Sequence, residues 1–131
     1  MDKAQALNQF WNSFGLRAYE VSTVPEYIFE NGEKVKVEMP YITYDVMTDN
    51  IERVVNLSAS LWYRSTSWED ITLKAKEIEK RLAEHGGEVV KLDRGYMYIY
   101  PGTPFTQHGT DPDDAIRRIN INVQVEFLTD Y

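Results

Sequence analysis

A histidine and three aspartates in the last third of the chain have the residue types best suited to chemistry. His108, Asp111, Asp113 and Asp114 offer the imidazole and carboxylate ligands that hard or borderline divalent metals take. Their spacing matches no established metal motif, and they lie in a stretch rich in Pro, Gly and Asp that is typical of a solvated loop. We therefore predict no metal site and no catalytic centre at this position.

Other catalytic arrangements find no support in the sequence. The absence of cysteine excludes disulfides, thiolate nucleophiles and thiolate metal sites. With two histidines in the whole chain and no convincing partner for its serines, a Ser-His-Asp triad is not indicated. No glycine-rich loop of the kind that holds a phosphate is present. We predict that the chain is not an enzyme and uses no cofactor.

Length and charge limit the class of protein further. The chain has 131 residues, 43% hydrophobic and 27% charged, which predicts a single soluble globular domain over 1–131 with a sizeable core. A net charge of −7 argues against a surface that grips a phosphate backbone. No apolar run approaches the roughly 20 residues of a membrane span, and the polar N-terminal stretch does not resemble a signal peptide. We expect the chain to be made and used in a cytoplasm.

The first forty residues predict a helix followed by a hairpin. Asp2 is a suitable N-cap, an apolar stripe follows at helical spacing, and Gly15 can end the helix. Asn31-Gly32 is a strong hairpin signal. It predicts arms over Tyr27–Glu30 and Lys34–Glu38 that protrude from the body as a hairpin spanning residues 26–38.

The middle of the chain predicts two strands and a helix. "YITYDVMT", beginning at Tyr41, and "RVVNLSASLWYR" alternate as strands do, and Asp49-Asn50 marks the turn between them. Thr66 with Glu69 forms a capping-box pattern, for which Ser67 is an alternative cap. A long amphipathic helix should follow.

Three more strands complete the predicted fold. "EVVKLD" and "YMYIY" form a tight hairpin around Arg94-Gly95, residues 101–114 form a long loop, and Ile119 to Phe127 alternate as the last strand. The element order predicts an α+β fold. It has an antiparallel or mixed sheet of about four to five strands, on which an N-terminal helix and one long amphipathic helix pack.

The stretch "SLWYRSTSWEDI" joins a strand to the long helix and contains two tryptophans. Trp68 lies on the apolar stripe of the helix and should belong to the core, whereas Trp62 lies on the more polar face of the strand. Without nearby basic residues, a nucleic-acid stacking platform is not indicated. The candidate subunit-interface residues are Trp62, Tyr63, Arg64, Phe105, His108, Arg117 and Arg118.

The order of these motifs resembles a known group of proteins. "MPYITYDV", "LWYRSTSWEDI", "EDITLKAKEIEKRL" and "RRININVQVEFL" look like the tail terminator, or tail-completion, proteins of long-tailed bacteriophages and prophages, which are often described as minor capsid or tail components. The resemblance covers roughly residues 38–128. The segment from 16 to 37 has no counterpart in it.

The resemblance implies a structural role in a virion. A tail terminator assembles into a ring, typically a hexamer, that caps the tail tube and joins it to the head. The expected partners are further copies of the chain, the tail tube protein and the head–tail connector protein. DNA would pass through the lumen without specific binding, and an acidic lumen would suit that passage. The expected location is the head–tail junction of the virion, with the host cytoplasm as the place of assembly and no membrane involved.

Three alternatives remain open from the sequence. A head–tail connector or head-completion protein has similar size and assembly logic. A non-phage α+β module could bind a small ligand or peptide in an aromatic pocket. An enzyme that uses the His108 loop ranks last.

Overall fold

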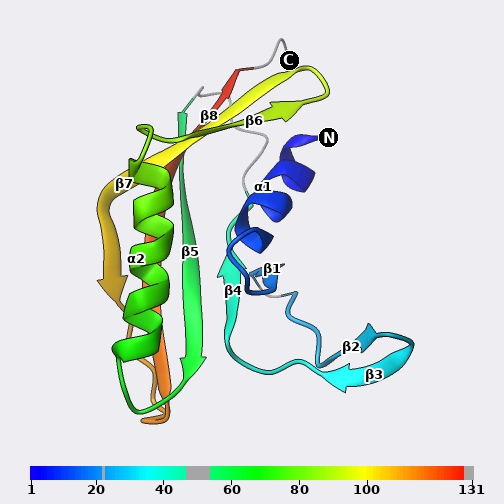
Figure 1. The fold of residues 1–131 in the computed structure, drawn as a ribbon, viewed down its shortest axis with the longest axis vertical. Helices are drawn as coiled ribbons and strands as arrows, with labels where there is room; N and C mark the ends of the chain where they lie inside the picture. The colour runs from blue at the N-terminus through cyan, green and yellow to red at the C-terminus, as the bar shows by residue number, and fades with distance from the viewer. Residues whose placement is uncertain (22, 47–53, 129–131) are drawn as a thin grey trace.

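A computed structural model describes residues 1–21, 23–46 and 54–128. Two helices and eight strands lie within these ranges (Figure 1). In chain order they are α1 (Lys3–Asn12), β1 (Ala18–Glu20), β2 (Tyr27–Glu30), β3 (Glu33–Lys36), β4 (Tyr41–Tyr44), β5 (Val54–Arg64), α2 (Glu69–Ala83), β6 (Glu88–Leu92), β7 (Gly95–His108) and β8 (Ile116–Leu128). The α+β class is confirmed.

Six of the strands form one mixed sheet in the order β1-β4-β5-β8-β7-β6, and β2 and β3 form a separate hairpin. β1 is parallel to β4, and all other neighbours are antiparallel. The sheet was predicted to have about four to five strands but has six, because β1 was not predicted. Three residues are too few to show a period of two, so the alternation that revealed the other strands gave no signal there.

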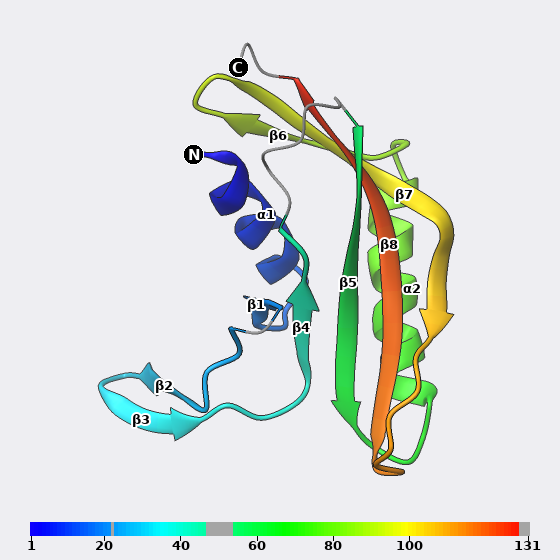
Figure 2. The ribbon, with the colours of Figure 1, turned by 180° about the vertical axis from the view of Figure 1, so that it is seen from behind.

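Both helices pack on the same face of this sheet, which we call the inner face. Alternate residues of the central strands point to it, so their apolar side chains meet those of the helices. Figure 2 shows β5 and β8 from the opposite, outer face, over which neither helix lies. The largest fully buried side chains are Trp11, Tyr44, Leu7, Ile42, Leu57, Leu61, Ile71, Ile78, Leu82, Met97, Ile99 and Ile121.

α1 contacts both edge strands of the sheet, β1 and β6. The backbone nitrogen of Asp93 donates to the carbonyl oxygen of Met1 at 2.9 Å, and the N-terminal amine pairs with the Asp93 side chain. The predicted N-cap at Asp2 is confirmed, and it is part of a capping box: Asp2 accepts from the Gln5 backbone nitrogen and the Gln5 side chain accepts from that of Asp2.

The predicted hairpin is confirmed as β2 and β3. Asn31 has φ 52° and Gly32 has φ 81°, the two left-handed residues that a type I′ turn needs. The hairpin projects from the body on the side away from α2 (Figure 1). The predicted turn at Asp49-Asn50 lies outside the described residues.

The long loop predicted at residues 101–114 was wrong for most of its length. β7 continues to His108, and an irregularity in its pairing with β8 between Pro101 and Thr106 absorbs the prolines. A Cβ at Gly102 would lie 2.9 Å from the carbonyl oxygen of Asn122, so the strands approach closely only because this residue is glycine. The Asn122 side chain donates to the Pro104 carbonyl at 2.9 Å. The turn proper is therefore short, between β7 and β8.

The predicted capping box of α2 was also wrong. Trp68, not Thr66, occupies the N-cap position and makes no side-chain cap. The Ser67 hydroxyl accepts a hydrogen bond from the Glu69 backbone nitrogen at 3.1 Å, which makes Ser67, the alternative cap, the residue that serves the first turn.

Ser67→Ala should therefore destabilise the protein by about 1 kcal/mol, the usual value of a helix-capping side chain. Thr66→Ala, the neighbouring control, should leave the free energy of unfolding within about 0.5 kcal/mol of the parent. Urea denaturation of the two variants measures this difference. A larger loss of unfolding free energy in Thr66→Ala than in Ser67→Ala would show that Thr66 caps the helix.

Candidate functional site

The outer face of the sheet carries a shallow polar groove over β4, β5 and β8. Its hydroxyl and amide side chains pair across the strands: Ser58 donates to Asn122 at 2.9 Å and Ser60 donates to Asn120 at 2.8 Å. The cavity measures about 360 Å³ and is lined by Val21, Thr43, Asp45, Ser58, Ala59, Ser60, Trp62, Gln107, Arg118, Asn120 and Asn122.

Trp62 and Arg118, two of the predicted interface residues, lie together in this groove. The Arg118 guanidinium sits over the Trp62 ring at 4.6 Å from its centroid and donates to the Ser60 hydroxyl at 3.2 Å. The Trp62 indole donates to the Thr43 hydroxyl at 2.9 Å. Trp62 is thus half-buried on the outer face and is not part of the core between sheet and helices.

A second group surrounds Trp68 where α2 begins. The His108 ring stacks on Trp68 at 3.9 Å between centroids and 4° between planes, and the Arg117 guanidinium lies 5.3 Å from the centroid of Trp68. Arg117 also donates to the carbonyl oxygens of Thr66 and Asp114, each at 2.8 Å. His108 and Arg117 therefore help to hold the strand-to-helix junction. Trp68 packs against the core from a partly buried position.

The aspartates beside His108 serve the turn between β7 and β8. Asp111 accepts from the Asp113 backbone nitrogen at 2.9 Å, and Asp113 accepts from that of Ala115 at 2.8 Å. Asp113 also pairs with Arg64 at 3.7 Å. Among residues 1–21, 23–46 and 54–128, no group of three or more histidine or acidic side chains is placed to hold a metal ion.

The seven predicted interface residues do not form one site. Trp62 and Arg118 share the outer-face groove, whereas His108 and Arg117 share the Trp68 junction. The other three lie near the end of the sheet where β5 ends and β8 begins. Tyr63 and Phe105 are partly buried against the core, and Arg64 is exposed at the end of β5.

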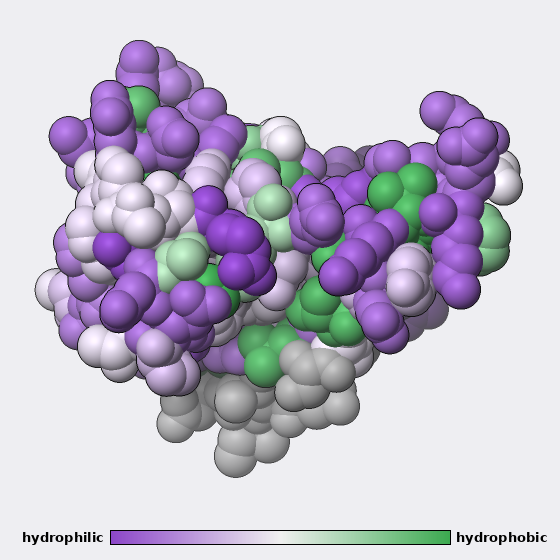
Figure 3. Space-filling model, turned by 90° about the horizontal axis from the view of Figure 1, so that it is seen from below, coloured by the Kyte–Doolittle hydropathy of each residue, from purple (hydrophilic) through white to green (hydrophobic). Residues whose placement is uncertain are grey.

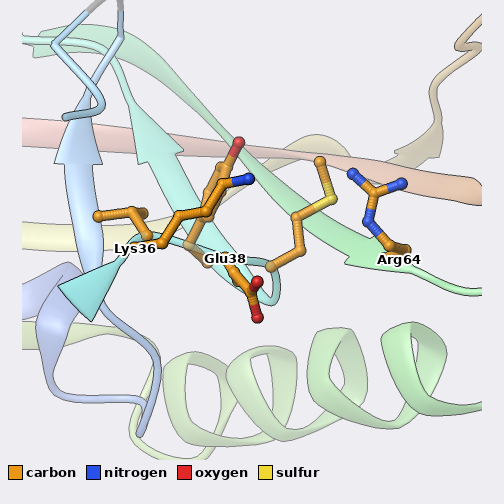
Figure 4. A pocket seen from close by; sticks show the side chains of 6 residues that line it. Lys36, Glu38 and Arg64 are labelled. Carbon is orange, nitrogen blue, oxygen red and sulfur yellow. The ribbon is translucent and has the colours of Figure 1, made fainter. Parts of the chain in front are cut away.

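Arg64 also borders an open pocket at the base of the hairpin (Figure 4). Lys36 and Glu38 lie on one side of it, and Arg64 faces them from β5. The cavity measures about 350 Å³. Three of its six lining residues, Lys36, Glu38 and Arg64, are charged, a larger charged share than the mostly apolar pockets of small-molecule sites have.

The β2–β3 hairpin was predicted, but none of its residues was among the interface candidates. Phe29 is 76% exposed and Tyr27 is 44% exposed. The register pairs Tyr27 with Lys36 and Phe29 with Lys34, so these four side chains share one face. The alternation of aromatic residues in β2 and lysines in β3 was readable in the sequence once the Asn-Gly turn fixed the register.

No protein-family model matches the chain, and no curated protein matches it at a significant level. Within the described part of the chain, no helix has the length and apolar character needed to span a membrane.

The buried hydroxyl of Tyr63 makes the stability of the protein depend on pH in the alkaline range. Burial raises the pKa of its hydroxyl, and the nearby charges of Asp70 and Glu77 raise it further. Above about pH 10, the ordinary value for tyrosine, the unfolded chain loses this proton before the folded chain does. Tyr63 therefore contributes stability that is complete below about pH 10 and is lost as the pH rises through the folded-state pKa.

In urea titrations from pH 8 to pH 11, the free energy of unfolding should fall less steeply above about pH 10 in Tyr63→Phe than in the parent. Tyr96→Phe, a change at an exposed tyrosine, is the control and should keep the parental slope. Identical slopes in the parent and in Tyr63→Phe would contradict this role for Tyr63.

Proposed function

We propose that the chain is a structural protein of a phage or prophage virion, a tail terminator that forms a ring at the head-proximal end of the tail tube. The sequence resemblance over residues 38–128 supports this role. So does an architecture whose evident features are surfaces for contact: a projecting hairpin and an uncovered polar sheet face.

The observation that carries the proposal is the exposed hairpin. A two-stranded hairpin is marginally stable by itself, yet this one holds Phe29 in solvent at 76% exposure on an arm that reaches away from the body (Figure 3). Phe29 and Tyr27 lie side by side on one face of the arm, and contiguous exposed apolar patches mark protein contacts. An arm of this kind suits a subunit that reaches over its neighbour in a ring.

The charge of the chain supports the same role. The net charge is −7, and a ring of several copies multiplies that charge. A negative lumen repels the phosphate backbone, so DNA can slide through without being retained.

Electron microscopy of tails made without this protein tests the proposed function. Such tails should vary in length and should fail to join heads, because the ring that ends tube growth and receives the head is missing. Tails of normal, uniform length that still join heads would contradict the role. Labelling of the chain in intact virions separates a terminator from a connector or head-completion protein by its position.

The hairpin has its own test in the same system. Phe29→Ser should lower the fraction of tails that join heads by at least about tenfold, as expected for loss of a buried aromatic anchor. Val89→Ser removes another exposed apolar side chain, 59% exposed on β6, and should leave joining unchanged. Equal effects from both substitutions would contradict a role for the hairpin in assembly. Circular dichroism checks that both variants fold.

The outer-face groove favours a second candidate, a ligand-binding module. The groove offers one aromatic ring and several amide and hydroxyl groups in about 360 Å³, but the guanidinium of Arg118 already covers the Trp62 ring. This candidate predicts a stable monomer in solution that is absent from tails, which mass measurements and labelling of purified tails decide.

A further inference from the structure

We infer that the hairpin of one copy binds the exposed face of α2 on the next copy, with Phe29 and Leu73 as the two apolar centres of the contact. The inference rests on the proposed function in that it names the contact by which the ring is built. It commits to a second copy of this chain as the occupant of both surfaces.

The first surface is the outward face of the hairpin, which consists of Tyr27, Phe29, Lys34 and Lys36. The two aromatic side chains alternate with the two lysines in the register of β2 and β3, and the Lys34 amine lies 4.4 Å from the centroid of the Tyr27 ring. All four side chains are exposed. This face is therefore apolar at its centre and positive around it.

The opposite face of the hairpin is directed to its own body. Ile28 and Val35 are half-buried there and border the pocket between hairpin and body, and Glu30 pairs with Arg17. The hairpin is thus held on one side by its own copy. Lys36, at the base of the hairpin, also lines the pockets toward the body, whereas Phe29 and Lys34, nearer the turn, line neither and remain available for a neighbour.

The second surface is the face of α2 that points away from the sheet. Leu73 is 59% exposed, and helical spacing places it opposite the buried stripe of α2. Its neighbours one turn away are Glu69, Asp70, Lys76 and Glu77, all exposed.

The two surfaces are complementary in charge as well as in polarity. Three of the four neighbours of Leu73 are acidic, and one of these, Glu77, also pairs with Lys74 at 2.9 Å. The hairpin face carries two lysines and no acidic residue. Placing the aromatic side chains against Leu73 therefore brings lysines to carboxylates, which favours this pairing over hairpin–hairpin or helix–helix contacts.

The position of the surfaces in the molecule determines the type of assembly. The hairpin and α2 lie on opposite sides of the body in both ribbon views (Figures 1 and 2). A contact between two different surfaces on opposite sides is heterologous, and repeated copies then form a closed ring or an open filament and not a two-fold dimer. The tail terminator role requires the closed form.

Cysteine crosslinking tests the contact directly, because the chain has no cysteine of its own. Lys36→Cys combined with Lys76→Cys leaves Phe29 and Leu73 in place. A short bismaleimide reagent should join concentrated protein, or protein on purified tails, into a ladder of trimers and larger species. Lys36→Cys combined with Lys91→Cys, the control, should give no ladder beyond dimers.

A charge exchange tests the specificity of the pairing. Lys34→Glu/Lys36→Glu and Glu69→Lys/Asp70→Lys, each alone, should lower assembly on tails by at least about tenfold, because like charges then face each other. An equimolar mixture of the two variants should restore assembly, since alternating copies have only complementary contacts. Lys91→Glu/Arg94→Glu makes the same charge change as the hairpin variant at exposed residues of β6 and the β6–β7 turn, outside both surfaces, and should assemble normally.

The outcomes separate this inference from the proposed function. A chain that oligomerises or ends tails normally without the crosslinked ladder, or whose mixed variants are not restored, overturns the inference alone. Charge-reversed variants that form the ring but fail to bind the tube would make the tube protein the occupant and would also overturn it. A chain that remains monomeric in solution and on tails overturns both, and thermal unfolding of each variant verifies folding.

Discussion

The pairing of β5 with β8 is the constraint on which the rest of the structure depends. Val54–Arg64 lies antiparallel to Ile116–Glu126 in an unbroken register. Because side chains alternate along a strand, this register fixes which residues face the helices and which face outwards. A slip of one residue would send Leu57, Ala59 and Leu61 to the outer face and would place Ser58 and Ser60 against α2. The apolar burial on one face and the serine–asparagine pairs on the other make that slip costly.

The same register separates the structural part of the molecule from its contact surfaces. The inner face is covered by α1 and α2 and supplies the core. What remains outside is the polar groove with Trp62 and Arg118, the solvent face of α2, and the hairpin beyond β1. The hairpin's exposed aromatic face and the exposed Leu73 are among the apolar side chains that the core does not use, and their charged neighbours are complementary, which is why the proposed assembly is built on them.

The sequence predicted those parts of the fold in which a hydrophobic pattern repeats over many residues. Ten or more alternating residues in β5 and β8, and four turns of α2, are signals that tertiary structure rarely reverses. The N-cap at Asp2 and the Asn-Gly hairpin were predicted correctly from local chemistry. β1 was missed because three residues carry no period. Residues 101–108 were assigned to a loop because two prolines and a glycine normally interrupt a strand. Here, an irregular pairing and the side chain of Asn122 make the strand possible, and neither is local in sequence.

The candidate site was predicted less well, for a related reason. The grouping of Trp62 with Arg118, and of His108 with Arg117 around Trp68, depends on strand neighbours far apart in the chain. The prediction of a cap at Thr66 was wrong because α2 begins at Glu69 with Trp68 in the N-cap position, where its ring stacks on His108. The hairpin surface needed a register before its aromatic residues and lysines could be assigned to one face.

A cryo-electron microscopy reconstruction of the head-proximal end of the tail is the most direct test of the central claim, that copies of this chain form a ring through contacts between the hairpin and α2. The expected result is a closed ring of copies in which each hairpin lies on α2 of the next copy, with Phe29 near Leu73. A reconstruction in which the chain is absent from this position would contradict the proposed function, and a ring whose hairpins point into solvent would contradict the proposed contact.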